Sequence, residues 1–243
     1  MSLIITLYIR EGIVMASDSR LTLKTSREQS KEQEKKIIRQ MAVAQSDSIY
    51  KTFLTPQGLG ISTFGAAEIK GMPIAGYIES FITEELAGEN IPVDQVPGLI
   101  KEYFSKMEKD LNVGFHVAGY KKRAKSYEQH VWRVDVGRDE IMQINEVDQP
   151  GLSWAGEGDI ISRLVKRVSV HDEDGEDKRL PYYQIPYGFF TLQDAIDFSI
   201  YAVRTTIESL RFQPRPKTVG GPIDVLVIKP ERSFWVKRKE LEA

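Results

Sequence analysis

Ser2 is the residue of this sequence with the clearest capacity for chemistry, because it directly follows Met1. Its small side chain is of the kind that methionine aminopeptidases tolerate, so we expect a mature chain that begins with serine and carries a free α-amine. An α-amine titrates at roughly 7.7 to 8.0, and part of it is therefore unprotonated near neutral pH. Ser2 would then supply both a hydroxyl nucleophile and its own general base.

The segment from Gly12 to Thr22 reads Gly-Ile-Val-Met-Ala-Ser-Asp-Ser-Arg-Leu-Thr. It closely resembles the Gly-Val-Val-Leu-Ala-Ala-Asp-Ser-Arg-Ala-Thr segment of proteasome β subunits and of the related bacterial peptidase that works with an ATPase ring. Counted back from Asp18, the N-terminal nucleophile of that family falls on Ser2. The chain is therefore identified, by resemblance, as a bacterial-type, proteasome β-subunit-like member of the N-terminal nucleophile (Ntn) hydrolase superfamily.

Later segments resemble landmarks of the same family in the same order. Lys51 opens a Lys-Thr-Phe-Leu strand, Gly65 opens a Gly-Ala-Ala-Glu helix entry, and Gly156 lies within Trp-Ala-Gly-Glu-Gly. The Val-Gly-Gly-Pro-Ile-Asp-Val segment over 219–225 resembles the family's Ser-Gly-Gly and the strand that follows it. The resemblance covers most of the chain, and it implies insertions near 24–46 and 171–188.

The resemblance also implies a role for each matching residue. Lys51 would lie beside Ser2, where its charge disfavours the protonated amine and stabilises a developing alkoxide. Asp18 would pair with that lysine and position it. A backbone N–H near Phe64 or Gly65 would donate to the carbonyl oxygen under attack. For each charged residue the alternative is an ion pair at the end of a strand, without a catalytic role.

Three positions depart from the family pattern. Glu157 stands where catalytic members have a serine, and an inward-pointing carboxylate would favour the protonated amine. Pro216 and Val219 stand where the family has an aspartate and a serine, and neither offers a side-chain hydrogen bond. These departures keep a second class of function open, a catalytically silent ring or binding subunit.

Other candidate sites are weaker. The histidines His116, His130 and His171 are far apart and lack metal-binding spacing. The acidic run over 171–177 does not follow the positions of an EF-hand loop, which favours a solvated loop. The aromatic residues over 182–190 could contact a partner or a substrate, although packing of that loop onto its own domain is the simpler interpretation. Neither a metal nor a cofactor is expected.

Composition excludes several classes of protein. The 243 residues are 41% hydrophobic and 28% charged, as in a globular protein that buries a core. Lys and Arg total 33 against 35 Asp and Glu, so the excess positive charge that a nucleic-acid partner requires is missing. The absence of cysteine excludes thiolate chemistry. The opening apolar run Leu3–Ile9 is too short to span a bilayer, and we expect a cytoplasmic protein.

The elements that would position these residues follow from periodicity. Alternating β-branched and aromatic residues predict strands, over 3–9, 13–16, 49–54, 59–64, 113–120, 130–136, 141–147, 152–155, 223–228 and 233–236. Apolar residues three and four apart predict amphipathic helices, over 66–86, 96–111, 160–170 and 192–210, with Thr191 as the N-cap of the last. The charged segment 24–45 is expected to be a solvated helix or a mobile arm, and 171–188 a loop.

Strands grouped apart from helices predict an α+β protein with antiparallel sheets. We expect one domain over 1–243 with a four-layer αββα sandwich, two antiparallel sheets between helical layers, as in the Ntn hydrolase fold. The implied activity is amide or peptide hydrolysis by Ser2, and a small-amide hydrolase of the same superfamily is the enzymatic alternative. The resemblance implies a homo-oligomeric ring; neither its size nor an ATPase partner follows from one sequence.

Overall fold

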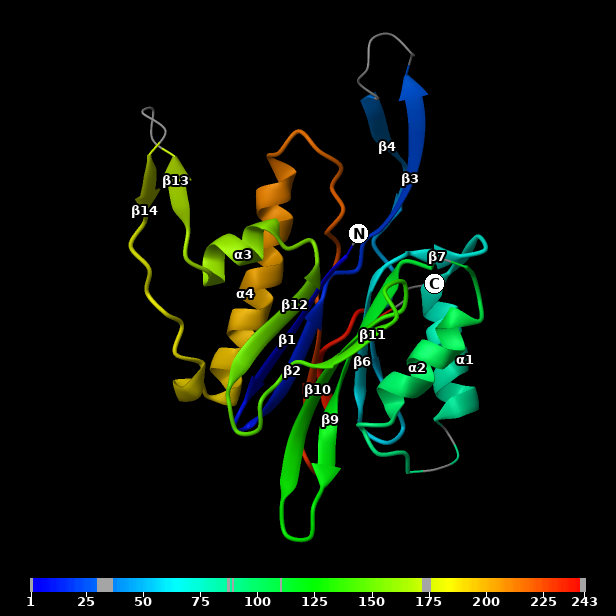
Figure 1. Ribbon diagram of the computed structural model, residues 1–243, viewed down its shortest axis with the longest axis vertical. Helices are drawn as coiled ribbons and strands as arrows, with labels where there is room; N and C mark the ends of the chain where they lie inside the picture. The colour runs from blue at the N-terminus through cyan, green and yellow to red at the C-terminus, as the bar shows by residue number, and fades with distance from the viewer. Residues whose placement is uncertain are drawn as a thin grey trace.

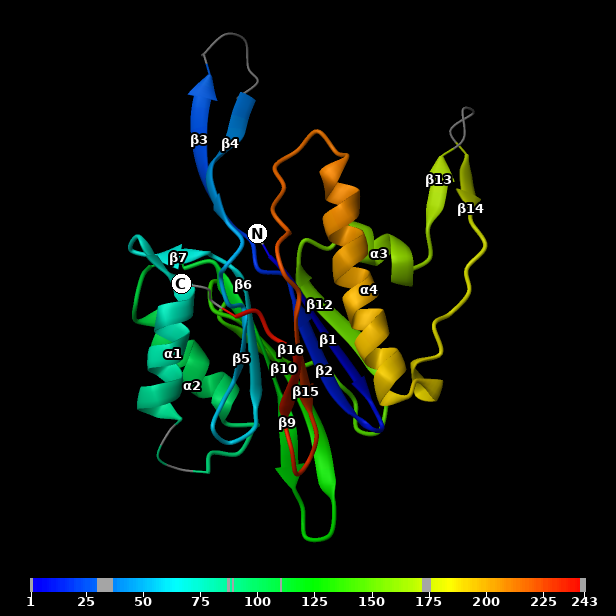
Figure 2. The ribbon, with the colours of Figure 1, turned by 180° about the vertical axis from the view of Figure 1, so that it is seen from behind.

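The structure is a computed structural model that describes residues 2–29, 37–86, 88, 90–109, 111–171 and 176–240 (Figure 1). Two sheets of five strands each carry most of the described chain. Figures 1 and 2 show α1 (Ile74–Glu85) and α2 (Val96–Ser105) on one side of these sheets, and α3 (Asp159–Val165) and α4 (Leu192–Arg211) on the other.

The first sheet has the order β12-β1-β2-β15-β16, and every neighbouring pair is antiparallel. Its strands are β1 (Leu3–Ile9), β2 (Gly12–Ser17), β12 (Gly151–Gly156), β15 (Asp224–Ile228) and β16 (Phe234–Lys237). The predicted hairpin at the start of the chain is confirmed. Because β12 and β15 flank it, segments far apart in the sequence meet at the end of the sheet where Ser2 lies.

The second sheet has the order β11-β10-β9-β6-β5 and is also antiparallel. Its strands are β5 (Thr52–Leu54), β6 (Gly60–Gly65), β9 (Val113–Lys122), β10 (Tyr127–Asp135) and β11 (Glu140–Gln143). All five coincide with predicted strands, although β5 and β11 are shorter than the apolar runs suggested.

Three two-stranded sheets complete the described strands: β3 (Leu21–Gln29) with β4 (Ile37–Ser46), β7 (Glu68–Ile69) with β8 (Met72–Pro73), and β13 (Ser169–His171) with β14 (Asp177–Arg179). The helix that was one alternative over 24–45 is therefore wrong for 24–29 and 37–45, which are strands; the other alternative, a mobile arm, stays a prediction, and 30–36 lie outside the described residues. Antiparallel pairing between β3 and β4 determines the backbone here, despite the charge pattern. The predicted loop over 171–188 contains β14, and 172–175 are not described.

The helices differ from prediction mainly at their ends. The helix predicted from 66 begins at Ile74, because the β7–β8 turn comes first and Pro73 serves as the N-cap. The helix predicted to reach 111 ends at Ser105. The longest helix is confirmed, and Thr191 caps it with a capping box shared with Asp194.

Strand β1 shows how the first sheet is packed. All seven of its residues are buried, which an antiparallel strand achieves only when both faces of its sheet are covered. Leu3, Ile5, Leu7 and Ile9 belong to a core with α3, α4 and β15. On the opposite face, Tyr8 belongs to a smaller core that joins both sheets.

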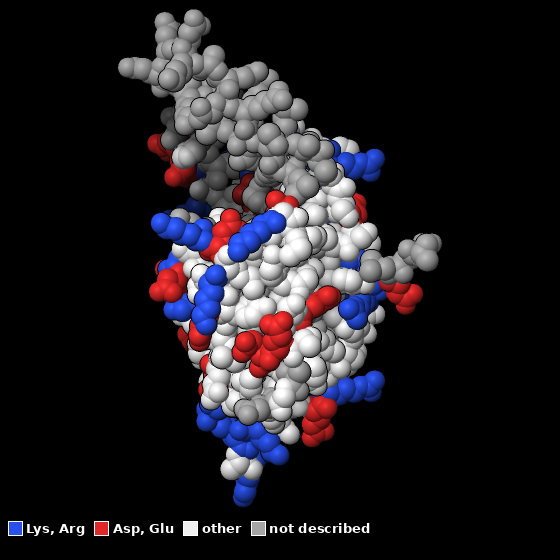
Figure 3. Space-filling view, turned by 90° about the vertical axis from the view of Figure 1, so that its right-hand side faces the viewer, with Lys and Arg blue, Asp and Glu red and all other residues white. Residues whose placement is uncertain are grey.

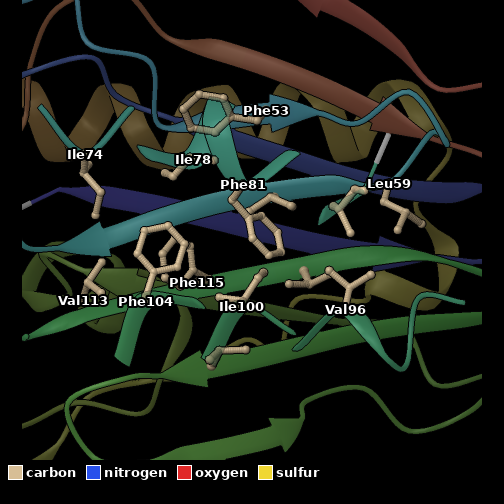
Figure 4. Packing of buried hydrophobic residues seen from close by; sticks show 14 of the residues in the cluster. Phe53, Leu59, Ile74, Ile78, Phe81, Val96, Ile100, Phe104, Val113 and Phe115 are labelled. Carbon is tan, nitrogen blue, oxygen red and sulfur yellow. The ribbon is translucent and has the colours of Figure 1, made fainter. Parts of the chain in front are cut away.

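The second sheet is covered by α1 and α2 through an aromatic core (Figure 4). Phe104 lies at its centre, with ring centroids 4.7 Å from Phe115 and 6.2 Å from Phe81. Together the three cores define a mixed α/β fold of antiparallel sheets and helices. The strict four-layer sandwich remains a prediction.

Charged side chains are interspersed on the face that carries α1 and α2. Figure 3 shows Asp and Glu among Lys and Arg over this face, with basic side chains gathered at the lower tip. Lys121, Lys122 and Arg123 lie in that region, where β9 turns toward β10. Apart from that tip, the face carries a mixture of both signs.

Candidate active site

Ser2 lies directly before β1, and only 8% of its surface is exposed. Its carbonyl oxygen accepts a hydrogen bond of 2.7 Å from the N–H of Glu157. Gly156 lies opposite Leu3 in the β1–β12 ladder and has a φ of +92°. A Cβ on Gly156 would come within 1.7 Å of the Ser2 carbonyl oxygen, so this close backbone approach requires glycine.

Asp18 follows β2, and its side chain is fully buried. Oδ1 accepts from the Leu3 N–H (2.9 Å) and the Lys51 Nζ (2.7 Å), and Oδ2 from the N–H groups of Arg20 (3.1 Å) and Gly220 (3.0 Å). Asp18 therefore joins the start of β1, the start of β5 and the Gly220 turn. The predicted pairing of Asp18 with Lys51 is present in the structure.

Lys51 lies directly before β5 and is 3% exposed. Burial lowers the pKa of Lys51, since removal from water penalises the ammonium form, while the nearby Asp18 carboxylate opposes that effect. Its backbone carbonyl accepts from the Thr63 N–H at 2.8 Å, which continues the pairing of β5 with β6. Lys51 is thus held at both its backbone and its side chain.

A chain of buried hydroxyls explains why Asp18 and Lys51 meet. The Thr52 hydroxyl lies 2.9 Å from that of Ser17 in the first sheet and 2.9 Å from that of Ser62 in the second. Ser17 precedes Asp18 and Thr52 follows Lys51 in the sequence. The hydroxyl bridge between the sheets therefore sets the separation of the ion pair beside it.

Gly65 ends β6 in a left-handed conformation, with a φ of +94°. A Cβ there would come within 2.5 Å of the Asn112 carbonyl oxygen, so a larger residue does not fit. That same oxygen accepts the Ala66 N–H at 2.8 Å, which excludes Ala66 as a free donor to a substrate. Donation by the Gly65 backbone stays a prediction.

Glu157 is buried, but its charge is not isolated. Its Oε1 accepts from Arg215 Nη1 at 3.0 Å, and its Oε2 accepts from the Thr218 hydroxyl at 3.2 Å. Arg215 also reaches Asp159 at 3.2 Å. The sequence indicated the unusual carboxylate but gave no signal for its partners, because Arg215 lies 58 residues away and no motif links the two positions.

The other two departures from the family pattern lie beside these partners. Val219 is buried in the core with α3 and α4 and offers no polar group. Its neighbour Thr218 is also buried and carries a hydroxyl that sequence reasoning missed. Pro216 lies between Arg215 and Lys217, and Val219 follows Thr218, so each apolar position has at least one polar neighbour in the sequence.

A second buried ion pair, between Asp224 and Lys239, was also missed. Asp224 starts β15 directly opposite Ser17, the residue before Asp18. Arg20 and Asp47 form a bidentate ion pair, with Nε–Oδ1 and Nη2–Oδ2 distances of 2.6 and 2.7 Å. Both side chains are partly exposed. This ion pair gives Arg20 a structural role.

The histidines occupy separate places. His116 is buried and shares a 3.0 Å hydrogen bond with Thr6; His130 lies 3.5 Å from Glu128, and the exposed His171 pairs with Asp177 at 2.8 Å. No group of three metal-ligating residues occurs among the described ones. Likewise, no described helix is long and apolar enough to cross a membrane.

The aromatic loop over 182–190 is only partly packed. The ring of Tyr187 lies 5.6 Å from that of Phe190 and 6.0 Å from that of Phe198 on α4. Burial raises the pKa of Tyr187 to about 12. In contrast, Tyr183 and Phe189 are almost fully exposed. Packing of the loop onto its own domain therefore accounts for part of the aromatic set.

Comparison with known proteins shows the fold. No family model and no curated protein matches the chain. A solved structure, the Anbu (Gly-1) mutant from Hyphomicrobium sp. strain MC1, matches with a TM-score of 0.56 and 12% identity over 97% of this chain and 87% of the other. At that identity the likeness concerns the fold alone. It corrects the sequence-based identification of the chain as a bacterial-type, proteasome β-subunit-like protein: the shared property is an Anbu-like fold, and no family is assigned.

Proposed function

We propose that this protein hydrolyses amide or peptide bonds with Ser2 as an N-terminal nucleophile, after removal of Met1. The observation that carries the proposal is the coordination of Asp18. One carboxylate oxygen accepts both the N–H of Leu3, the residue after Ser2, and the ammonium of Lys51. This arrangement fixes a positive charge close to the start of β1, where it favours an unprotonated amine and an ionised hydroxyl.

The reaction that these groups support has two stages. Ser2 Oγ forms a bond to the amide carbonyl carbon while the Ser2 α-amine takes the hydroxyl proton. The C–N bond then breaks, and the leaving amine receives that proton. In the second stage the same amine takes a proton from a water molecule as the water oxygen attacks the ester carbonyl carbon. The C–Oγ bond then breaks, Ser2 Oγ receives that proton, and the acid leaves. The Gly65 backbone N–H is our proposed donor to the carbonyl oxygen in both stages.

The hydrogen bonds around Ser2 support this role. Glu157 N–H donates to the Ser2 carbonyl, which directs the backbone of Ser2 without using its hydroxyl. The Glu157 carboxylate is engaged by Arg215 and Thr218, which offsets the charge that would otherwise favour the protonated amine. We propose a single domain over 1–243 that works as a homo-oligomer on peptide or small amide substrates.

The test is a hydrolysis assay on two substrate sets, capped amino-acid amides and longer peptides, both with a fluorogenic leaving amine. We expect Ser2→Ala to lower the rate at least about 1,000-fold, because the hydroxyl nucleophile is lost although the α-amine base remains. Ser48→Ala, at an exposed serine, is the matched control and should keep the wild-type rate. Full activity in Ser2→Ala would overturn the proposal, and the preferred substrate length would separate peptidase from small-amide hydrolase.

A catalytically silent assembly or binding subunit is the second candidate. It is favoured by the burial of Ser2 and by the buried Glu157, which brings a carboxylate to the residue that is hydrogen-bonded to Ser2. Under this alternative the Asp18–Lys51 pair only joins the two sheets. A chain that keeps Met1, or that turns over neither substrate set, would support this candidate over hydrolysis.

A further inference from the structure

An open pocket of about 520 Å³ lies at the base of the β13–β14 hairpin. Figure 1 shows this hairpin beside α3, outside the two five-stranded sheets. The pocket has the volume of a site for a small molecule or for one residue of a partner. Its lining comes from the segment after α3, from both strands and from the loop after β14: Arg167, Val168, Ser169, Arg179, Leu180 and Tyr182.

Pairing across the hairpin brings the polar groups of this pocket together. Ser169 lies directly opposite Arg179 in the β13–β14 ladder, so their side chains project from the same face of the hairpin. The Leu180 N–H donates to the Val168 carbonyl at 3.1 Å, which extends the pairing toward α3. Arg167 precedes Ser169 by two residues, and side chains two apart along a strand share a face. Two guanidinium groups and one hydroxyl therefore lie on one side of the hairpin.

Tyr182 supplies an anchored apolar wall beside these groups. Its hydroxyl donates to the carbonyl of Val165, the last residue of α3, at 3.1 Å. The guanidinium of Arg167 lies over its ring, 5.5 Å from the centroid, which is a cation–π distance. The ring thus holds Arg167 in place before a ligand arrives, and such preorganisation lowers the entropic cost of binding.

The positive charge of the pocket is not neutralised by the described part of the chain. The ion pairs of this region join Asp177 to His171 at the other end of the β13–β14 ladder, and Arg215 to Glu157 and Asp159. None of the ion pairs between described residues includes Arg167 or Arg179. The whole chain carries 33 basic against 35 acidic residues, so two unpaired arginines at one pocket are not a consequence of composition.

This combination of groups selects an anion that is joined to an apolar group. Guanidinium groups bind carboxylates through paired, charge-assisted hydrogen bonds. A bare anion would leave the Tyr182 ring and Leu180 without a partner, whereas the last residue of a peptide combines a carboxylate with a side chain. The hairpin is a two-stranded sheet with open edges, to which the main chain of an extended peptide can pair.

We propose that this pocket binds the free C-terminal carboxylate of a peptide whose last side chain is apolar. Arg167, Arg179 and the Ser169 hydroxyl bind the carboxylate, and the last side chain packs against Tyr182 and Leu180. The site takes no part in bond cleavage, and its lining does not include Ser2. It therefore goes beyond the proposed function and holds for a hydrolase and for a binding subunit alike.

The experiment measures binding of short fluorescein-labelled peptides to the full chain by fluorescence polarisation. The probes share a Gly-Ser-Gly-Ser leader and end in leucine, leucine amide, glutamate amide or glycine. We expect saturable binding of the leucine acid and about 100-fold weaker binding of both amides, because two charge-assisted contacts are lost together. The glycine acid should bind about ten-fold more weakly, since it lacks the apolar side chain.

Arg167→Gln with Arg179→Gln should weaken binding of the leucine acid about 100-fold and leave that of the leucine amide unchanged. This double-mutant cycle isolates the contact between the arginines and the carboxylate. Lys178→Gln is the matched control, because Lys178 is an exposed cation of the same hairpin whose side chain faces the other side. It should bind every probe as the wild type does.

Four results would overturn the inference. Equal affinity for the leucine acid and either amide, or an equal loss in Lys178→Gln, would show general attraction between charges. Equal affinity for the leucine and glycine acids would remove the apolar contact. Inorganic phosphate that displaces the probe as well as the unlabelled leucine acid does would show a site for any anion. Ser2→Ala should bind like the wild type, so a failure of hydrolysis leaves this result unaffected.

Discussion

Two buried polar centres of this protein, the Asp18–Lys51 pair and His116, offset the free-energy cost of removing polar groups from water in opposite ways. At the end of the first sheet, Asp18 and Lys51 keep their charges and are surrounded by hydrogen-bond partners. Between the two sheets, His116 has one partner, Thr6, and its Nε2 has none among the described residues. Burial lowers the pKa of His116 to about 3, so that centre is neutral at physiological pH.

The difference distinguishes a centre suited to catalysis, the Asp18–Lys51 pair, from a structural contact between the sheets, the His116–Thr6 hydrogen bond. A buried charge with several donors is expensive to build and is retained where a fixed electric field is used. A buried neutral histidine joins β9 to β1 at little electrostatic cost. We therefore place the chemistry at the charged centre, although histidine is the more frequent general base in enzymes.

Lys51→Met should produce the largest effect, because it leaves the Asp18 carboxylate buried without its cation. We expect a loss of stability of about 3 to 5 kcal/mol and of any Ser2 acylation. Urea unfolding measures the loss of stability, and intact mass after incubation with a β-lactone measures the loss of Ser2 acylation. Lys106→Met is the matched control: its partner Glu102 is exposed, so about 0.5 kcal/mol or less should be lost. Equal stability of the two variants would mean that the buried Asp18–Lys51 pair costs no more to break than the exposed Glu102–Lys106 pair, which would contradict this account.

Gly156→Ala should come next. The new Cβ would overlap the Ser2 carbonyl oxygen, and the positive φ adds strain, so we expect a loss on the order of 3 kcal/mol together with a displaced Ser2. Gly98→Ala, in α2 with open space around it, should instead stabilise the protein by about 0.5 to 1 kcal/mol. Thermal unfolding compares them. A harmless Gly156→Ala would contradict the close backbone approach at the site.

The effect of His116 should be the smallest near neutral pH and should grow as the pH falls. The unfolded chain binds a proton near pH 6.5, whereas folded His116 resists protonation down to about pH 3. The unfolded state therefore holds more protons in this window, and stability falls as pH falls from 6.5 toward 3, by at most about 1.4 kcal/mol per unit. His116→Gln should flatten that slope in urea titrations, with the exposed His171→Gln as control. An unchanged slope would show that His116 does not stay neutral.

Prediction from sequence succeeded where signals are local. The apolar, β-branched runs of β1 and β2 predict the hairpin. Asp18 and Lys51 were named through the resemblance and not through a local signal; their ion pair is present, and their catalytic roles stay predictions. Thr191 was predicted from the sequence as the N-cap of α4, and the structure confirms it. The hairpin and the cap depend on neighbours in the chain.

The missed features depend on distant partners. The pairing of Arg215 with Glu157 and that of Lys239 with Asp224 arise from how strands meet at one end of the sheets, and no spacing rule indicates them. A helix was one alternative predicted for the segment after Lys24 because its charge pattern is helix-like, whereas pairing with the Ile37–Ser46 strand determines its backbone. Tertiary context decides such cases.

Intact mass of the untagged protein, before and after incubation with a β-lactone, tests the central claim most directly. The account predicts a chain without Met1 that gains one lactone, and no adduct in Ser2→Ala. An adduct that persists in Ser2→Ala, or a chain that retains Met1 and stays unmodified, would contradict the assignment of Ser2 as the nucleophile.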